Sequence, residues 1–242
     1  MTVEATPNPK SKTADAQKVF FVSLGCPKNQ VDSELMLGEL TARNMEVVED
    51  ASAADVLVVN TCSFVEEARE ESVDTILDLA HVKANAERPQ KLVVAGCLPQ
   101  RYENELKAEL PEVDHFLGTG DIARIGEMLA PKAGKTLPMA PRSLVGRPGY
   151  NYDAYSPRVQ TTPSWTSYVK IAEGCSQVCA FCIIPRLRGG QKSRRIADIV
   201  EEVRQLADRG VREINLIAQD LTHFGDDTKT GDSLAGLLRE LV

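Results

Sequence analysis

Three cysteines occur within one short stretch, EGCSQVCAFC, where Cys175, Cys179 and Cys182 form the pattern C-x3-C-x2-C. Three thiols this close in one loop can meet a single metal centre, and the thiolate is the form that binds metal. A structural zinc site requires four ligands, and no fourth cysteine or histidine lies nearby in the sequence. Iron–sulfur clusters are also usually held by four thiolates, so three would leave one iron open. The alternatives are a packed loop of cysteines or a zinc site completed from a distant part of the chain.

The other three cysteines, Cys26, Cys62 and Cys97, lie 36 and 35 residues apart, and each follows an apolar run: VSLGC, VLVVNTC and LVVAGC. In a parallel sheet, the residues just beyond the carboxyl ends of the strands lie at one edge, where open α/β folds place their ligands. Taken alone, each of these cysteines is more typical of a buried core residue. Their equivalent positions predict that the three meet in space and form a second three-thiolate cluster site, again with an open iron.

The elements that must position these cysteines alternate along the chain from residue 18 to about residue 130. Strand, helix, strand and helix repeated in this way predict an α/β fold with a parallel, flavodoxin-like sheet and right-handed crossovers. We therefore interpret 18–130 as an N-terminal cluster domain. The expected strands cover residues 19–24, 56–59 and 92–95, and the expected helices cover residues 31–42, 65–80 and 101–110.

A second domain is expected over residues 164–242, after a linker at 131–163 that is rich in proline, glycine and polar residues. It contains a strand at about 168–171, the cysteine loop, a helix from Ile196 that ends before Gly210, and the strand EINLIAQD. This is the first part of a partial βα barrel. A barrel usually requires about 200 residues or more, so we expect this domain to be incomplete. Residues 1–17 are polar and are expected to be a disordered leader.

The composition is that of a globular protein: 242 residues, 43% hydrophobic and 26% charged. No apolar run reaches the length of a membrane span, and the polar first residues lack the apolar centre of a signal peptide. We therefore expect a cytoplasmic protein with no membrane partner. Thiols are kept reduced in the cytoplasm, so six cysteines indicate metal binding or catalysis rather than a disulfide framework.

The net charge of −7 argues against broad, non-specific binding of nucleic acid. One window differs, because seven basic residues and a single acid, Glu173, occur between residues 158 and 195. A solvated surface is the simplest interpretation of such a cluster, and a local basic site is the alternative. The basic residues are Arg158, Lys170, Arg186, Arg188, Lys192, Arg194 and Arg195.

The pattern C-x3-C-x-F-C after a strand is similar to the signature of radical S-adenosylmethionine (SAM) enzymes, with Phe181 at the aromatic position. The longer string EGCSQVCAFCIIPRLRGG resembles the methylthiotransferases of that class. Their N-terminal domain supplies three further cysteines, which Cys26, Cys62 and Cys97 match. The likeness covers about residues 18–242. It implies two 4Fe–4S clusters as cofactors, together with SAM bound at the cluster of the cysteine loop.

Several strings resemble the RimO branch of this family, which modifies a ribosomal protein: GCPKNQVDSE, NTCSFVEEAREESVDTIL, GCLPQRYENEL, PEVDHFLGTGD and LIAQDLTHFG. That branch places a methylthio group on the β-carbon of an aspartate in small-subunit ribosomal protein S-twelve, which the resemblance implies as the substrate. A MiaB-like enzyme that modifies adenosine in transfer RNA is the alternative substrate class. An electron-transfer iron–sulfur protein without SAM chemistry is a third hypothesis.

The resemblance also implies a division of labour between the two cysteine sets. An electron from a reductant such as flavodoxin or ferredoxin would cleave SAM to a radical that abstracts hydrogen from the substrate, and the second cluster would hold the sulfur. No catalytic residue is expected beyond the cluster ligands. Four residues are candidates for the SAM region, with surface exposure or helix capping as the alternative: Phe181, Arg186, Arg188 and Gln219. Asn29 and Asp32 are expected to mark a helix start rather than to act in catalysis.

Two departures from the family pattern are visible. The family usually continues into Ser-Arg-Pro where this chain reads Ser193-Arg194-Arg195, so a backbone angle that proline would fix is left free. Relatives also continue through the rest of a partial barrel and into a small β-barrel (TRAM) domain, which this sequence does not contain.

Overall fold

The computed structural model describes residues 16–129 and 142–242, which form two compact units. Unit 1 contains the described residues up to Gly146 together with Pro157–Thr161, and unit 2 contains Arg147–Ser156 and Thr162–Val242. The chain thus passes from one unit to the other three times within the stretch expected to be a linker. Residues 1–15 of the expected leader and 131–141 of that linker lie outside the described residues.

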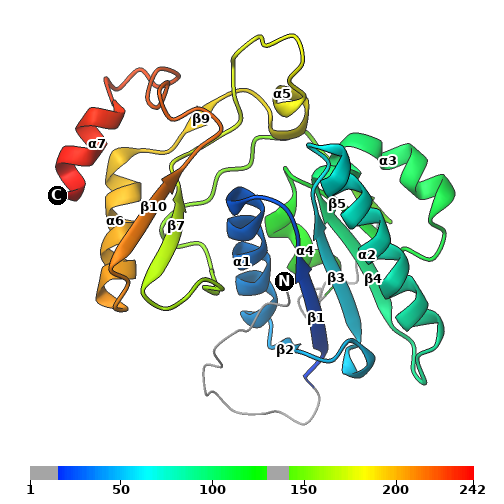
Figure 1. Cartoon of the computed structure of the whole chain (residues 1–242). Coiled ribbons are helices and arrows are strands. Elements are labelled where there is room, and N and C mark those ends of the chain that lie inside the picture. The colour runs from blue at the N-terminus through cyan, green and yellow to red at the C-terminus, as the bar shows by residue number, and fades with distance from the viewer. Residues whose placement is uncertain (1–15, 130–141) are drawn as a thin grey trace. The chain divides into compact units, whose positions relative to one another are not determined.

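Unit 1 is built on a six-stranded parallel sheet, with the order β2-β1-β3-β4-β5-β6 (Figure 1). The first five strands in this order reproduce the flavodoxin-like arrangement, in which the strand order reverses between β1 and β3. The predicted parallel α/β fold is therefore confirmed. The strands are β1 (Lys18–Ser23), β2 (Glu46–Val48), β3 (Val56–Thr61), β4 (Lys91–Gly96), β5 (His115–Gly118) and β6 (Ser143–Leu144).

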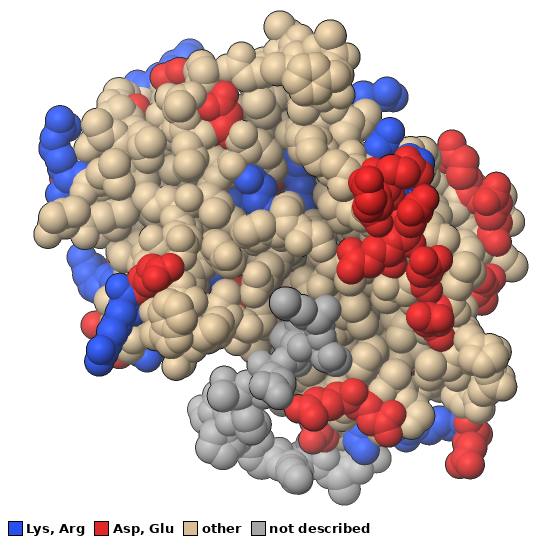
Figure 2. Space-filling view, in the orientation of Figure 1, with Lys and Arg blue, Asp and Glu red and all other residues tan. Residues whose placement is uncertain are grey.

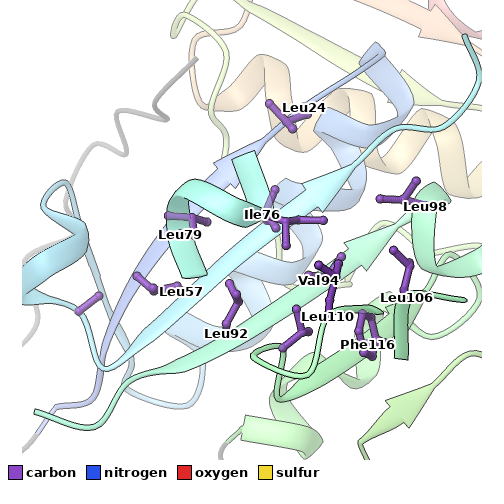
Figure 3. Packing of buried hydrophobic residues seen from close by; sticks show 13 residues of the cluster. Leu24, Leu57, Ile76, Leu79, Leu92, Val94, Leu98, Leu106, Leu110 and Phe116 are labelled. Atoms are coloured by element: carbon purple, nitrogen blue, oxygen red, sulfur yellow. The ribbon is translucent and has the colours of Figure 1, made fainter. Parts of the chain in front are cut away.

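The helical segments of unit 1 are α1 (Pro27–Thr41), η1 (Ala51–Ala53), α2 (Glu66–Ala84), α3 (Cys97–Glu109), η2 (Ile122–Arg124) and α4 (Ile125–Leu129). A large apolar core joins α2 and α3 to the sheet (Figure 3). Alternate residues of the strands, such as Leu57 and Leu92, point into this core and meet Ile76 of α2 and Leu106 of α3. Burying one such side chain contributes about 1.5–3 kcal/mol, so this layer fixes the sheet and its edge.

Helix α1 begins at Pro27, four residues before the start predicted from apolar periodicity. Cys26 is its N-cap residue, and Pro27 occupies the first helical position, where a missing N–H costs nothing. The prediction was wrong because the first turns of α1 bury polar side chains, which carry no apolar period. Asn29, Ser33 and Glu34 are each no more than 1% exposed.

One of these polar side chains, Glu34, holds the segment Pro157–Thr161 against α1. The Glu34 carboxylate accepts hydrogen bonds from the Arg158 Nε at 2.7 Å and from the Thr161 backbone N–H at 2.8 Å. Gly38 permits the approach, because a Cβ at this position would collide with the Pro157 carbonyl. The segment expected to be a linker is therefore anchored at this point.

Unit 2 contains β7 (Thr166–Lys170), β8 (Ala172–Glu173), α5 (Ile184–Arg188), β9 (Lys192–Ser193), α6 (Ile196–Asp208), β10 (Glu213–Ile217) and α7 (Leu234–Leu241). β7 and β10 pair in parallel, with α6 between them in the sequence, as the βαβ pattern predicted. β8 and β9 form a short antiparallel pair. The apolar face of α6, including Ile199 and Leu206, packs on β7 and α7.

Arg194 is the central charge of unit 2 and is 4% exposed. Its guanidinium donates to the Glu202 carboxylate at 2.5 Å, to Asp198 at 2.8 Å and to the Lys170 carbonyl at 3.0 Å. Its Cζ lies 4.2 Å from the centroid of the Tyr152 ring. Burial alone would lower the pKa of Arg194, but Tyr152, Glu202 and Asp198 outweigh burial and raise it. Tyr152, from the expected linker, is thus part of the core of unit 2.

The window of seven basic residues is mostly internal, so a solvated surface is the wrong interpretation for four of them. Three of these are buried and Arg158 is half-buried, and each of the four forms an ion pair with a buried or half-buried acid: Arg158, Lys170, Arg188 and Arg194. Such pairs offset the cost of burying charge only when the partners are well placed. Arg186, Lys192 and Arg195 are exposed.

The strongest charge on the face shown in Figure 2 is acidic and lies over α2. Six exposed acids line this helix: Glu66, Glu67, Glu70, Glu71, Asp74 and Asp78. This face contributes much of the net charge and repels polyanions. In the described residues, no helix is long and apolar enough to cross a membrane.

The backbone at Arg195, where the resembling sequences usually carry proline, already has a conformation that proline can adopt. Arg195 has φ of −69°, within the range that proline fixes, and its backbone N–H donates no hydrogen bond among the described residues. We expect Arg195→Pro to raise the free energy of unfolding by about 0.4–1 kcal/mol, because it restricts only the unfolded chain. Urea unfolding would measure this. Arg195→Ala is the matched control, and a proline variant less stable than the alanine variant would contradict the expectation.

Candidate functional site

Cys26, Cys62 and Cys97 follow three neighbouring strands of unit 1. Cys62 comes directly after Thr61 at the end of β3, Cys97 comes directly after β4, and Cys26 comes three residues after β1. Because β1, β3 and β4 are adjacent and parallel, all three cysteines start from the same edge of the sheet. This edge includes the point between β1 and β3 where the strand order reverses, which is where open α/β folds bind ligands.

The backbone around these cysteines is held by side chains of unit 1. The Ser72 hydroxyl of α2 accepts a hydrogen bond from the Cys62 N–H at 3.1 Å and lies 2.9 Å from the Cys62 carbonyl. The Ser63 hydroxyl donates to the Cys97 carbonyl at 3.1 Å. Cys62 and Cys97 are each 7% exposed, whereas Cys26 is exposed. The positions of the two buried thiols are therefore set by the fold itself.

Two of the three thiols lie at the N-terminal ends of helices. Cys26 is the N-cap residue of α1, and Cys97 is the first residue of α3. The aligned peptide dipoles place partial positive charge at a helix N-terminus, so negative charge is favoured there. This environment suits thiolates, and it suits any anionic group that they bind.

Asn29 lies among the three strand ends and was missed as a site residue, because its spacing to Asp32 suggested only a helix start. Its side chain is fully buried, and its Oδ1 accepts a hydrogen bond from the Cys97 thiol at 3.8 Å. One signal was available in the sequence. Asn29 stands one helical turn after Cys26, so the start of the helix at Cys26 places both at the sheet edge.

The donors at this edge have the chemistry of iron–sulfur cluster ligands. No three His, Cys, Asp or Glu side chains in residues 16–129 and 142–242 are grouped so that they could hold one metal ion. A cluster makes a different demand, because each thiolate binds a different iron of a larger body. The cysteines at the edge are free thiols, and sulfur is the ligand that iron–sulfur clusters take from proteins.

The second cysteine set lies in unit 2, in the loop that follows β8. The Cys175 N–H donates to the Gly189 carbonyl at 3.0 Å, and the Cys182 N–H donates to the Cys179 carbonyl at 3.1 Å. Cys175 is buried, Cys182 is half-buried and Cys179 is exposed. The loop thus presents thiols from a short segment that is anchored at its first cysteine, and its all-sulfur donors again fit an iron–sulfur cluster.

Two of the four SAM-region candidates converge on Glu173, the residue two positions before Cys175. The Gln219 Nε2 donates to the Glu173 carboxylate at 2.9 Å, and the Arg188 Nη1 lies 3.6 Å from it. The Lys170 Nζ donates to the same carboxylate at 2.6 Å. Sequence reasoning missed Lys170 and Glu173 as a pair. Their signal was a lysine and an acid within an otherwise apolar strand region.

The other two candidates do not join this network. Phe181 is 93% exposed, and Arg186 is also exposed. A separate contact ties the loop to the end of β10, because the Gln177 Nε2 donates to the Asp220 carboxylate at 3.2 Å. A hydrogen bond from Thr222, helped by Gln177 and His223, lowers the pKa of Asp220 below its usual value. Asp220 is therefore a carboxylate at neutral pH.

Gly25 is expected to be intolerant of a side chain, because of both its backbone and its neighbour. Its φ is +88°, and a Cβ would lie 2.7 Å from the Cys62 Cβ and 3.2 Å from its Sγ. We expect Gly25→Ala to cost about 1–2 kcal/mol of backbone strain and about 1–3 kcal/mol more from the clash.

Gly210→Ala is the matched control, since Gly210 has φ of +94° but open space around its Cβ position. Native-state hydrogen exchange measures the loss in the unit that carries each variant. Equal losses of stability for Gly25→Ala and Gly210→Ala would contradict a clash with Cys62.

Comparison with known proteins shows what this chain is similar to. Residues 18–118 match the model of the uncharacterized protein family UPF0004. The chain is 53% identical over 230 residues to a protein of Geotalea uraniireducens named ribosomal protein uS12 methylthiotransferase RimO, covering 95% of this chain and 50% of that protein. A protein of the same name from Myxococcus xanthus is 52% identical over 231 residues, covering 96% of this chain and 47% of the relative.

The chain spans about half the length of the curated relatives it matches. The matched part includes both cysteine sets, since the alignments cover nearly the whole chain. Over nearly its whole length the chain is thus similar to part of these relatives, which are named RimO methylthiotransferases.

Proposed function

We propose that this chain carries both cluster sites of a radical SAM methylthiotransferase that acts on ribosomal protein uS12, which is the small-subunit protein S-twelve. Cys26, Cys62 and Cys97 would hold one 4Fe–4S cluster at the sheet edge of unit 1. The loop thiols of Cys175, Cys179 and Cys182 would hold the second, at which SAM binds. The observation that carries the proposal is the position of the first three cysteines, which follow three adjacent parallel strands within three residues of each strand end.

The bound clusters and SAM would supply the radical and the sulfur that form a carbon–sulfur bond at the β-carbon of a substrate aspartate. The residues of the chain bind and orient these groups. Thiolates at the sheet edge are favoured by the helix N-termini of α1 and α3. In unit 2, the buried group of Glu173, Arg188 and Gln219 lies directly before the cysteine loop and supports a role in the SAM region. Phe181 and Arg186 are exposed where they could contact SAM.

The names of the relatives support uS12 as the substrate, and the charge of unit 1 favours a protein over transfer RNA. The acidic face of α2 repels a polyanion, whereas ribosomal proteins are commonly basic. We place the activity in the cytoplasm, where free thiols stay reduced. A reductant such as flavodoxin or ferredoxin would supply the electrons.

The two cysteine sets predict a definite iron content. After anaerobic reconstitution with ferrous iron and sulfide, we expect about eight irons in the unsubstituted chain and about four when either set is replaced by alanine. SAM should change the electron paramagnetic resonance (EPR) spectrum of the loop cluster and leave the spectrum of the edge cluster unchanged. Four irons or fewer in the unsubstituted chain, or no response to SAM, would sink the two-cluster proposal and favour an electron-transfer protein.

The substrate is tested in cells that carry the gene and in cells from which it is deleted. We expect uS12 to gain the mass of one methylthio group, on an aspartate, only when the gene is present. Transfer RNA nucleosides from the same cells are digested and compared by mass spectrometry. A methylthio group on adenosine that follows the gene, with unmodified uS12, would overturn the protein substrate and favour the MiaB-like alternative.

A further inference from the structure

We infer that Asn29 is a positioning residue that fixes the spacing between the segments carrying Cys26 and Cys62 for cluster binding at the sheet edge. This inference rests on the proposed function, because it concerns the cluster that Cys26, Cys62 and Cys97 would hold. The side chain is fully buried in the first turn of α1, where a polar amide is unusual. Its amide contacts Leu24, just after β1, Thr61 at the end of β3, and Cys97 at the start of α3.

The amide nitrogen of Asn29 joins the ends of β1 and β3. It donates to the Leu24 carbonyl at 3.0 Å and to the Thr61 carbonyl at 2.8 Å. Leu24 lies two residues before Cys26, and Thr61 lies one residue before Cys62. One –NH₂ group therefore fixes the distance between the backbones from which two of the three thiols extend.

The amide oxygen of Asn29 reaches the third cysteine. Carbonyl oxygens only accept hydrogen bonds, so the –NH₂ group must face Leu24 and Thr61, and Oδ1 is left to face the Cys97 thiol at 3.8 Å. The orientation of the amide is thus determined by its partners. This last hydrogen bond needs the S–H proton, which Cys97 gives up when it binds iron as a thiolate, so the positioning role rests on the two contacts of the –NH₂ group.

The backbone of Asn29 is held as firmly as its side chain. Its carbonyl accepts hydrogen bonds from the Asn60 Nδ2 at 2.9 Å and from the Ser33 hydroxyl at 3.0 Å. The Asn60 amide also donates to the Ser33 hydroxyl at 2.9 Å. The first turns of α1 are therefore fastened to the end of β3, and Asn29 is not free to follow the cysteines if they move.

Asparagine is the residue type that these contacts require. An aspartate would place carboxylate oxygens against two carbonyl oxygens, and an aliphatic side chain would leave both carbonyls without this donor. Either change removes the link between the strand ends while leaving every thiol in the chain. Replacing Asn29 should therefore weaken cluster binding at the edge without removing a ligand.

The matched control is Gln90, a second buried amide of unit 1 with the same kind of contacts. Its Nε2 donates to the Ala51 and Ala54 carbonyls, each at 2.8 Å, and it lies just before β4, at the end of that strand opposite Cys97. Gln90→Ala removes two amide-to-carbonyl bonds from the same unit, as Asn29→Ala does. A purely structural role for Asn29 predicts that the two variants behave alike.

The experiment uses the full chain with Cys175, Cys179 and Cys182 replaced by alanine, so that only the edge can hold a cluster. The parent, Asn29→Ala and Gln90→Ala are reconstituted with ferrous iron and sulfide, and iron retention is measured against increasing chelator. We expect Asn29→Ala to lose about 10- to 100-fold in iron affinity, as is typical when a supporting contact is removed. Gln90→Ala should match the parent in affinity and in the EPR spectrum of the reduced cluster.

Three results would overturn the inference. Asn29→Ala with the iron affinity and EPR spectrum of the parent would do so. An equal loss of iron affinity in Gln90→Ala would do so as well. If Asn29→Ala does not fold, Asn29→Ser carries the same comparison, since serine is too short to bridge both carbonyls. A parent chain that binds no iron at the edge would overturn the proposed function together with the inference. A parent chain that binds about four irons, with variants of unchanged iron affinity, would overturn the inference alone.

Discussion

Because β1, β3 and β4 are parallel neighbours, their carboxyl ends lie along one edge, and every segment that follows them starts from that edge. The three cysteines of unit 1 are far apart in sequence but inherit a common location from this pairing. The core between the sheet and the helices α2 and α3 keeps the strands in register. Helix α1 begins at the same sheet edge, with Cys26 as its N-cap residue. Loss of parallel pairing at any one of the three strands would separate the thiols without changing any of them.

Helix α1 buries paired polar side chains in addition to apolar ones such as Val31, Leu35 and Leu40. A buried polar group without a partner costs about 1–3 kcal/mol, so such a face is stable only when each group finds its bond. Asn29, Ser33 and Glu34 all do, with partners on β3 and in the segment Pro157–Thr161. These bonds form in one register only, so they fix the position of the helix more narrowly than apolar packing would. The string GCPKNQVDSE, first noted as a family marker, therefore has a structural role inside unit 1.

Features carried by local patterns could be predicted from the sequence, whereas features made by distant polar pairs could not. Apolar runs revealed β1, β3 and β4, and their parallel order predicted that Cys26, Cys62 and Cys97 would follow the same edge of the sheet. Strands as short as β2 and β6 leave too few residues for a recognisable period. Glu34 and Arg158 are 124 residues apart, and no spacing rule links an acid in a helix to an arginine in a proline-rich stretch. The same limit hid the position of Asn29, whose side chain contacts Thr61 and Cys97, 32 and 68 residues away.

The two cysteine sets differ in how much of their positioning the chain itself supplies. At the sheet edge, two thiols are buried, and their backbones are bonded to Ser72 and Ser63. In the loop, Cys179 is exposed, and its neighbours Val178 and Phe181 are 97% and 93% exposed, so the apolar side chains there bury almost nothing. A ligand that orders a loop must offset the conformational entropy it removes, which lowers its affinity relative to a pre-organised site. The fold therefore positions the thiols of the edge set more fully than those of the loop set.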